Sequence, residues 1–128
     1  MTELSIARAR QSRHARPAEL KGTFDAIPVP DKSRDAIFLL LSAHELRNPI
    51  HRVKLFKEAV RVMDDSGRLL LAEHVRDWRN FLAFGPGRLH FHSRKEWMRA
   101  ATEAGLTVEY EGSITALVRW FVLRKSAP

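Results

Sequence analysis

Two glutamate–histidine pairs in this sequence carry side chains that can move a proton. His44 and Glu45 follow the apolar run at residues 36–41, and Glu73 and His74 end the apolar segment RLLLAEH. Imidazole titrates near neutral pH and a neighbouring carboxylate can fix its tautomer, so such a pair can orient a nucleophile or accept its proton. The alternative is that these residues cap helices and bond loop backbone. We take His44, Glu45 and His74 as candidate catalytic residues.

The stretch GPGRLHFHS at residues 85–93 offers phosphate binding, metal binding or substrate contact. A phosphate cradle needs consecutive N–H donors that lead directly into a helix, but Pro86 has no N–H and the next helix begins only near Ser93. His90 and His92 could chelate a metal, yet His74 is the only third ligand available to them. We therefore predict no metal site.

The remaining interpretation is that residues 76–92 form an ordered loop over a substrate. Aromatic and basic side chains alternate in RDWRNFLAFGPGRLHF. Such a loop can cover a small molecule, it can simply pack on the sheet, or it can bind single-stranded nucleic acid. The residues predicted to contact a substrate are Arg76, Asn80, Phe84, Arg88 and His90.

Size and composition restrict the class of protein. The chain has 128 residues, 45% hydrophobic and 29% charged, which is typical of one globular domain. It has no cysteine, no apolar run of membrane-spanning length and no hydrophobic leader segment, so we expect a cytoplasmic protein without disulfides. The formal net charge of +7 favours polyanions, but no nucleic-acid recognition motif accompanies it, and we do not expect nucleic acid as a partner.

The elements that position these residues alternate between strand and helix. The composition predicts a helix at residues 3–16, an irregular connection at 21–35 and a strand at 36–41 that is buried on both faces. A helix follows at about 50–65, ended by Gly67, and then a strand at 68–75 that is parallel to the first.

The second half of the chain predicts a helix and a hairpin. Ser93 and Glu96 have the spacing of a capping box, and Gly105 is placed to end the helix that they begin. The strands expected at 106–111 and 117–123 are separated by only five residues, GSITA, so they must be antiparallel. The fold class is therefore α/β, with an antiparallel last strand on an otherwise parallel sheet.

Several segments together resemble class I S-adenosylmethionine-dependent methyltransferases of type 11. They are GTFDAIPVPDKSRDAIFLLLSAHEL, FKEAVRVMDDSGRLLLAEH, with DDSG as the turn, and SRKEWMRAATEAGLTVEYE, followed by the terminal hairpin. The resemblance covers residues 20–125 and implies strands four to seven of a Rossmann-like sheet, with the reversed last strand of that family. It divides the chain into a basic helix and linker at 1–35 and the C-terminal half of a methyltransferase domain at 36–128.

The resemblance also implies a cofactor site. It places S-adenosylmethionine beside Thr23, Phe24, Asp25, Ser42 and Ala43, and a small-molecule methyl acceptor beside the loop at 76–92. The family's Gly-x-Gly turn is absent before residue 85, as is the acidic residue that reads the ribose, so we expect impaired cofactor binding. Two hypotheses follow: a truncated methyltransferase, or a non-catalytic module that forms a homodimer through the exposed edge of strand 36–42.

Overall fold

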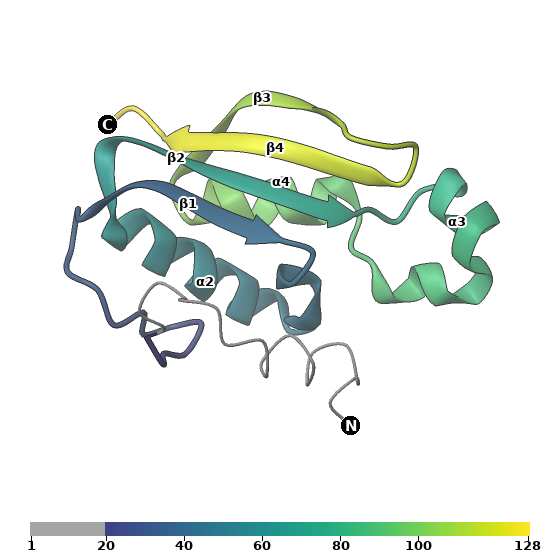
Figure 1. The fold of residues 1–128 in the computed structure, drawn as a ribbon, viewed down its shortest axis with the longest axis horizontal. Coiled ribbons are helices and arrows are strands. Elements are labelled where there is room, and N and C mark those ends of the chain that lie inside the picture. Colours follow the sequence, from purple (N-terminus) through teal and green to yellow (C-terminus); the bar gives the residue numbers. More distant parts are fainter. Residues whose placement is uncertain (1–19) are drawn as a thin grey trace, which may run out of the picture.

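The computed structural model describes residues 20–128 as a four-stranded sheet with helices packed on one face (Figure 1). The strands are β1 (Arg34–Leu40), β2 (Met63–His74), β3 (Leu106–Ser113) and β4 (Val118–Lys125). The helices are α2 (Pro49–Val62), α3 (Trp78–Phe84) and α4 (Arg94–Glu103), with short 3-10 turns η1 (Ala43–Glu45) and η2 (Gly85–His90). The predicted helix at 3–16 lies outside the described residues.

The strand order β1-β2-β4-β3 confirms the predicted α/β class. β1 and β2 are parallel, with Leu39 opposite Leu71, whereas β4 runs antiparallel to both β2 and β3. The last strand is therefore the reversed one. Because β1 and β2 are parallel, their carboxyl ends meet at one edge of the sheet, which brings the segments after Leu40 and around Glu73 together.

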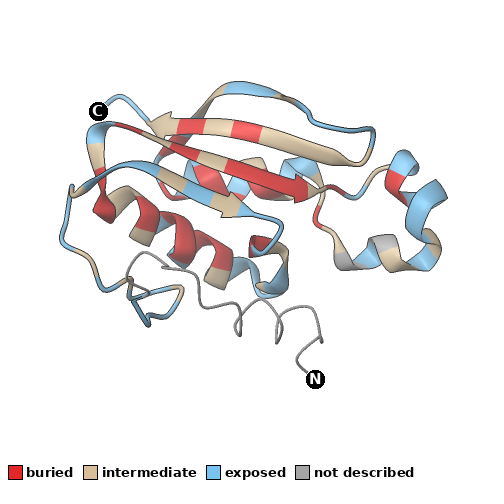
Figure 2. Cartoon of the chain, viewed as in Figure 1, coloured by how far each residue is buried: buried red, intermediate tan, exposed pale blue. Residues whose placement is uncertain are grey.

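The core lies between the sheet and the two long helices. Phe56 of α2 and Trp97 of α4 are both fully buried, with ring centroids 6.2 Å apart, and they pack over Leu71 and Phe121. Figure 2 shows the buried residues concentrated on β2, on the inner side of α2 and on α4. α2 starts where Asn48 accepts the Ile50 N–H and Pro49 occupies the first turn.

The prediction that strand 36–41 is buried on both faces is wrong for the described residues. Ile37 and Leu39 pack against the core, but Phe38 and Leu40 on the opposite face are 63% and 54% exposed. Tyr110 of β3 lies on the same face and is 62% exposed. The apolar run is continuous because both faces of the strand are apolar, although only one is covered by helices of the described chain.

Gly67 does not end α2 as predicted. The helix ends at Val62, and Met63 already has extended backbone angles and begins β2. The DDSG turn is instead an irregularity inside β2, where the pairing passes from Arg34–Met63 to Ala36–Arg68. A Cβ at Gly67 would collide with the Met63 side chain, so glycine permits this close approach.

The end of α4 and the terminal hairpin agree with the sequence. Ser93 accepts the Glu96 N–H while Glu96 accepts the Ser93 N–H, which is the predicted capping box. Gly105 follows α4 with a φ of +86°, a left-handed conformation that glycine adopts readily.

The segment at 76–92 differs from the prediction of a loop, because it contains α3 and η2. Asp77 caps α3 by accepting the Asn80 N–H.

Candidate functional site

A fully buried carboxylate organises the carboxyl edge of β1 and β2. Glu73 is 0% exposed, and its Oε1 accepts the backbone N–H groups of Ser42 at 2.9 Å and Ala43 at 2.7 Å. Its Oε2 lies 2.7 Å from Nδ1 of His44. Three donors on one segment thus compensate the charge that Glu73 buries.

The chain reaches Glu73 through a sharp turn after β1. The Leu41 N–H still bonds the Ala72 carbonyl at 2.8 Å, continuing the ladder, but Leu41 has a φ of +50°. That conformation is uncommon for a residue with a branched side chain. It redirects the backbone so that the next two N–H groups face Glu73 rather than the neighbouring strand.

His44 lies between two carboxylates of very different exposure. With Nδ1 donating to Glu73, Nε2 lies 3.1 Å from Oε1 of Glu45. The His44 side chain is 16% exposed and that of Glu45 is 78% exposed, so only Glu45 can turn away into solvent. When it does and Nε2 has released its proton to solvent, neutral His44 keeps its Nδ1–H on Glu73 and presents a free lone pair at Nε2, as a general base requires.

His74 points to the other face of β2 and does not pair with Glu73. Its Nδ1 lies 3.1 Å from the Leu117 carbonyl, and its ring stacks on Phe91 at 4.9 Å and meets the edge of Phe84 at 5.2 Å. Phe91 also meets His44 edge-on at 6.1 Å. The two predicted catalytic histidines therefore flank one aromatic cluster, but only His44 has a buried carboxylate partner.

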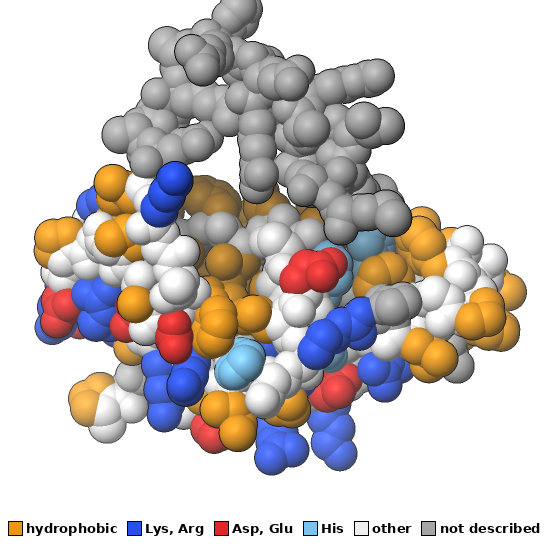
Figure 3. Space-filling model, turned by 90° about the horizontal axis from the view of Figure 1, so that it is seen from below, with side chains coloured by type: hydrophobic (Ala, Val, Ile, Leu, Met, Phe, Trp, Pro, Cys, Tyr) orange, Lys and Arg blue, Asp and Glu red, His pale blue; other side chains and the backbone are white. Residues whose placement is uncertain are grey.

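The segment with α3 and η2 extends beyond this cluster as an apolar end of the molecule. Trp78, Leu82 and Leu89 are 66%, 73% and 60% exposed. Figure 3 shows hydrophobic side chains gathered at this end, on the right of the view. An exposed apolar group of this kind suits contact with an apolar molecule better than with water.

The acceptor-contact residues predicted in this segment differ in their surroundings. Asn80 is 0% exposed and donates to the Leu117 carbonyl at 3.0 Å, while Arg76 Nε donates to the Phe91 carbonyl at 2.9 Å. Both side chains therefore hold the segment in place, whereas Phe84 is 43% exposed. The side chains of Arg88 and His90 lie outside the described part of the chain.

The predicted cofactor residues form two separate groups. Thr23 and Asp25 bond each other in a turn, and Phe24 lies 4.8 Å from the ring of His51 at the start of α2. Ser42 and Ala43 lie in the turn after β1, and both of their N–H groups are already used by Glu73. No hydrogen bond or ion pair within the described residues joins the two groups.

Sequence reasoning missed Arg52 and the environment of His92. His92 is 5% exposed, and its Nε2 lies 3.2 Å from the Arg52 guanidinium, so it must accept a hydrogen bond as a neutral ring. Burial, with the Arg52 charge adding to it, lowers the pKa of His92 below its ordinary value. No group of three or more histidine, cysteine, aspartate or glutamate side chains in the described residues could hold a metal ion.

The sheet order, the reversed last strand and the site at the carboxyl edge of parallel strands define a class I methyltransferase-like fold. The sequence model of the methyltransferase domain family, type 11, matches residues 1–71, which is more than half of the chain. The chain belongs to this family, and family membership implies S-adenosylmethionine as the methyl donor. No curated protein matches the chain.

Solved structures agree with the fold. A methyltransferase from Aquifex aeolicus is 22% identical, with a TM-score of 0.72. The alignment covers 93% of this chain and 60% of the Aquifex chain. One from Methanosarcina mazei is 15% identical with a TM-score of 0.68, covering 84% and 66%. A mitomycin 7-O-methyltransferase is 21% identical with a TM-score of 0.72, covering 95% and 38%. The chain thus spans less than two thirds of each. No helix in residues 20–128 is long and apolar enough to cross a membrane.

Proposed function

We propose that this chain forms the acceptor side of a methyl-transfer site that methylates a hydroxyl oxygen of a small molecule. The observation that carries the proposal is the contact between His44 and the buried carboxylate of Glu73. A sulfonium methyl group needs in-line positioning more than covalent help, but a hydroxyl nucleophile must lose its proton. A histidine held by one nitrogen, with the other nitrogen free, can accept that proton.

The division of work between the residues follows from their exposure. Nε2 of His44 accepts the hydroxyl proton, and the resulting imidazolium is stabilised by Glu73, which is 0% exposed and already close to Nδ1. Glu45, whose Oε1 lies 3.1 Å from Nε2, can bond that nitrogen only while it carries a proton, so Nε2 must first release this proton to solvent and Glu45 must turn away. Phe84 and Phe91, whose centroids are 5.3 Å apart, supply an apolar wall on the acceptor side and limit the entry of water.

The donors of the described residues do not fit the cofactor by themselves. The backbone N–H groups of Ser42 and Ala43 are both occupied by Glu73. Asp25, the one carboxylate among the predicted cofactor residues, accepts from Thr23 and lies 3.9 Å from Lys54. We therefore infer that this chain alone binds S-adenosylmethionine weakly. Calorimetric titration of the 128-residue chain checks this inference, and a micromolar dissociation constant would contradict it.

Methyl transfer can be tested with excess donor to compensate for weak binding. The chain is incubated with methyl-labelled S-adenosylmethionine at millimolar concentration and with a panel of small phenols and alcohols. We expect labelled product, and we expect His44→Gln to lower its rate about a hundredfold or more, because general-base catalysis contributes on that order. Lys57→Gln on the outer side of α2 is the control. Transfer that is unchanged in His44→Gln would remove His44 as the base.

A second candidate function is self-association through the edge of β1. The outer edge of β1 has no strand partner within the described residues, and Phe38 and Leu40 beside it are 63% and 54% exposed. Unpaired edges of this kind can pair with another chain. Sedimentation at micromolar concentration should then give a dimer that Phe38→Lys converts to a monomer, and a wild-type monomer would exclude this function.

A further inference from the structure

A cavity of about 190 Å³ lies between α2 and α4, and neither His44 nor Glu73 is among the residues that line it. Its apolar floor consists of Val53 and Ala100, which are 8% and 4% exposed. Since a water molecule occupies about 30 Å³, the cavity has room for on the order of six waters, or for a small metabolite. The methyl-transfer proposal uses none of the residues that line it.

Arg52 brings a buried, incompletely paired cation to one end of this cavity. It is 3% exposed, and one of its terminal nitrogens donates to the carbonyls of Leu46 at 2.8 Å and Arg47 at 2.9 Å. Its Nε is buried and has no hydrogen-bond partner among the described residues. Burial lowers the pKa of Arg52 and the charge of Glu96 offsets only part of that effect, so an anion in the cavity would further offset the desolvation of Arg52.

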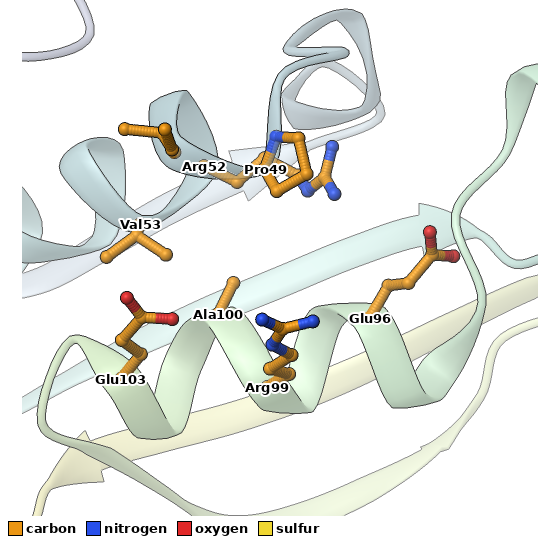
Figure 4. A pocket seen from close by; sticks show the side chains of 8 residues that line it. Pro49, Arg52, Val53, Glu96, Arg99, Ala100 and Glu103 are labelled. Atoms are coloured by element: carbon orange, nitrogen blue, oxygen red, sulfur yellow. The ribbon is translucent and has the colours of Figure 1, made fainter.

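Arg99 and Glu103 add one charge of each sign. Both line the cavity from α4, and within the described part of the chain neither has a hydrogen-bond or ion-pair partner. Figure 4 shows Arg99 rising from α4 toward α2 on the Arg52 side, with Glu103 at the opposite end beside Val53. The cavity therefore has two guanidinium groups and the Glu96 carboxylate toward one end, an apolar floor, and Glu103 alone at the other end.

Glu96 lines the cavity as well, and its charge favours the charged form of Arg52 without contacting it directly. Its Oε2 accepts the Ser93 N–H at 2.6 Å in the capping box, and no ion pair joins it to Arg52 within the described residues. A phosphate or a dicarboxylate would place excess negative charge near Glu96 and Glu103. A simple amine would leave the two guanidinium groups unpaired. A molecule with one carboxylate and one ammonium matches both ends.

We propose that the cavity between α2 and α4 binds a zwitterion the size of a small amino acid. Its carboxylate lies against Arg52 and Arg99, its ammonium lies against Glu103, and its carbon chain crosses Val53 and Ala100. This is a binding site separate from the methyl-transfer site, and its occupation ties the two helices together.

The test uses three probes of similar length: 4-aminobutyrate, butyrate and butylamine. Calorimetry or ligand-induced changes in NMR chemical shift on the full chain should show binding of 4-aminobutyrate, with at least about tenfold weaker binding of the other two, because each lacks one charged contact. Equal binding of all three, or no binding of 4-aminobutyrate, would overturn the proposal.

Variants locate the bound probe. Arg99→Ala and Glu103→Gln should each weaken 4-aminobutyrate binding about tenfold, and neither removes a hydrogen bond or ion pair of the described residues. Lys95→Ala removes a charge of α4 outside this cavity and is the matched control, which should bind as the wild type does. His44→Gln should also bind normally, so failure of the methyl-transfer proposal leaves this one standing. Binding that is unchanged in both cavity variants would contradict it.

Discussion

The regions around His44 and His74 look alike in sequence and differ in structure. Each histidine has a glutamate neighbour in the chain and lies at the carboxyl end of an apolar strand. In the fold, the buried Glu73 of β2 contacts His44, which follows β1. Its neighbour in sequence, His74, contacts instead the Leu117 carbonyl and the rings of two phenylalanines. Side chains alternate along a strand, so adjacent residues cannot share a face. The His44–Glu73 pair is therefore formed between β2 and the turn η1 that follows β1, and not between neighbours in one strand.

The largest effect on stability should come from removing the carboxylate of Glu73, which pairs with His44 and not with His74. Glu73→Ala leaves the N–H groups of Ser42 and Ala43 without an acceptor and opens a cavity beside His44. We expect a loss of about 3–5 kcal/mol in the free energy of unfolding, measured with urea. His74→Ala is the comparison and should cost about 1–2 kcal/mol. Equal losses in the two variants would mean that Glu73 does not organise this edge.

A smaller effect on stability should come from the coupling between His74 and Asn80, the two donors near the Leu117 carbonyl. His74 and Asn80 both approach the Leu117 carbonyl, at 3.1 Å and 3.0 Å. Each single alanine variant leaves that carbonyl one donor, but the double variant leaves none. We expect the double variant to lose about 1 kcal/mol more than the sum of the singles, measured in a double-mutant cycle of urea unfolding. Strict additivity would show that the shared carbonyl does not couple them.

His92 offers a third environment, with the Arg52 guanidinium 3.2 Å from Nε2 and the Glu96 carboxylate 4.0 Å from Nδ1. The pKa of His92 is lowered from 6.5 in the folded state, so below that pH the unfolded chain binds the additional proton. Stability is therefore full above about pH 6.5 and declines as the pH falls below that value. Urea unfolding as a function of pH measures this decline. His92→Gln can still accept from Arg52, and it should remove this part of the pH dependence.

The smallest effect should come from the glutamate beside His44 in sequence. Glu45 is 78% exposed, so Glu45→Gln should change the free energy of unfolding by less than about 0.5 kcal/mol. If Glu45 takes no part in proton transfer, the same variant should keep the rate of methyl transfer within about threefold of the wild type. A loss as large as that of His44→Gln would instead make Glu45 part of the proton-transfer machinery. The labelled-product assay distinguishes these results.

The sequence predicts those features that depend on local pattern. The capping box of Ser93, the glycine after α4 and the antiparallel hairpin follow from residue spacing alone, and the position of His44 follows from the end of an apolar strand. The pairing of Glu73 with His44 does not, because it depends on strand register. The sequence does contain a signal for α3, because Asp77 is a good N-cap residue three positions before Asn80. The mixture of aromatic, glycine and arginine residues across 76–92 nevertheless favours a loop.

Other features escape prediction because packing decides them. Gly67 has the position of a helix end, yet close contact with Met63 is what requires it. Arg52 is a charged residue in the first turn of α2, where the sequence suggests exposure. It is buried because one terminal nitrogen has three acceptors, the carbonyls of Leu46 and Arg47 and the His92 ring. Phe38 and Leu40 belong to an apolar run that suggests full burial, but no described helix covers their face.

The central claim is that Glu73 holds the Nδ1–H of His44 and leaves Nε2 available as a base. Nitrogen NMR of the His44 ring at a pH where the ring is neutral tests it directly, with the wild type and Glu73→Gln compared. We predict a protonated Nδ1 and an unprotonated Nε2 in the wild type, and loss of that preference in Glu73→Gln. A wild-type ring with its proton on Nε2, or an identical tautomer in both proteins, would contradict the account.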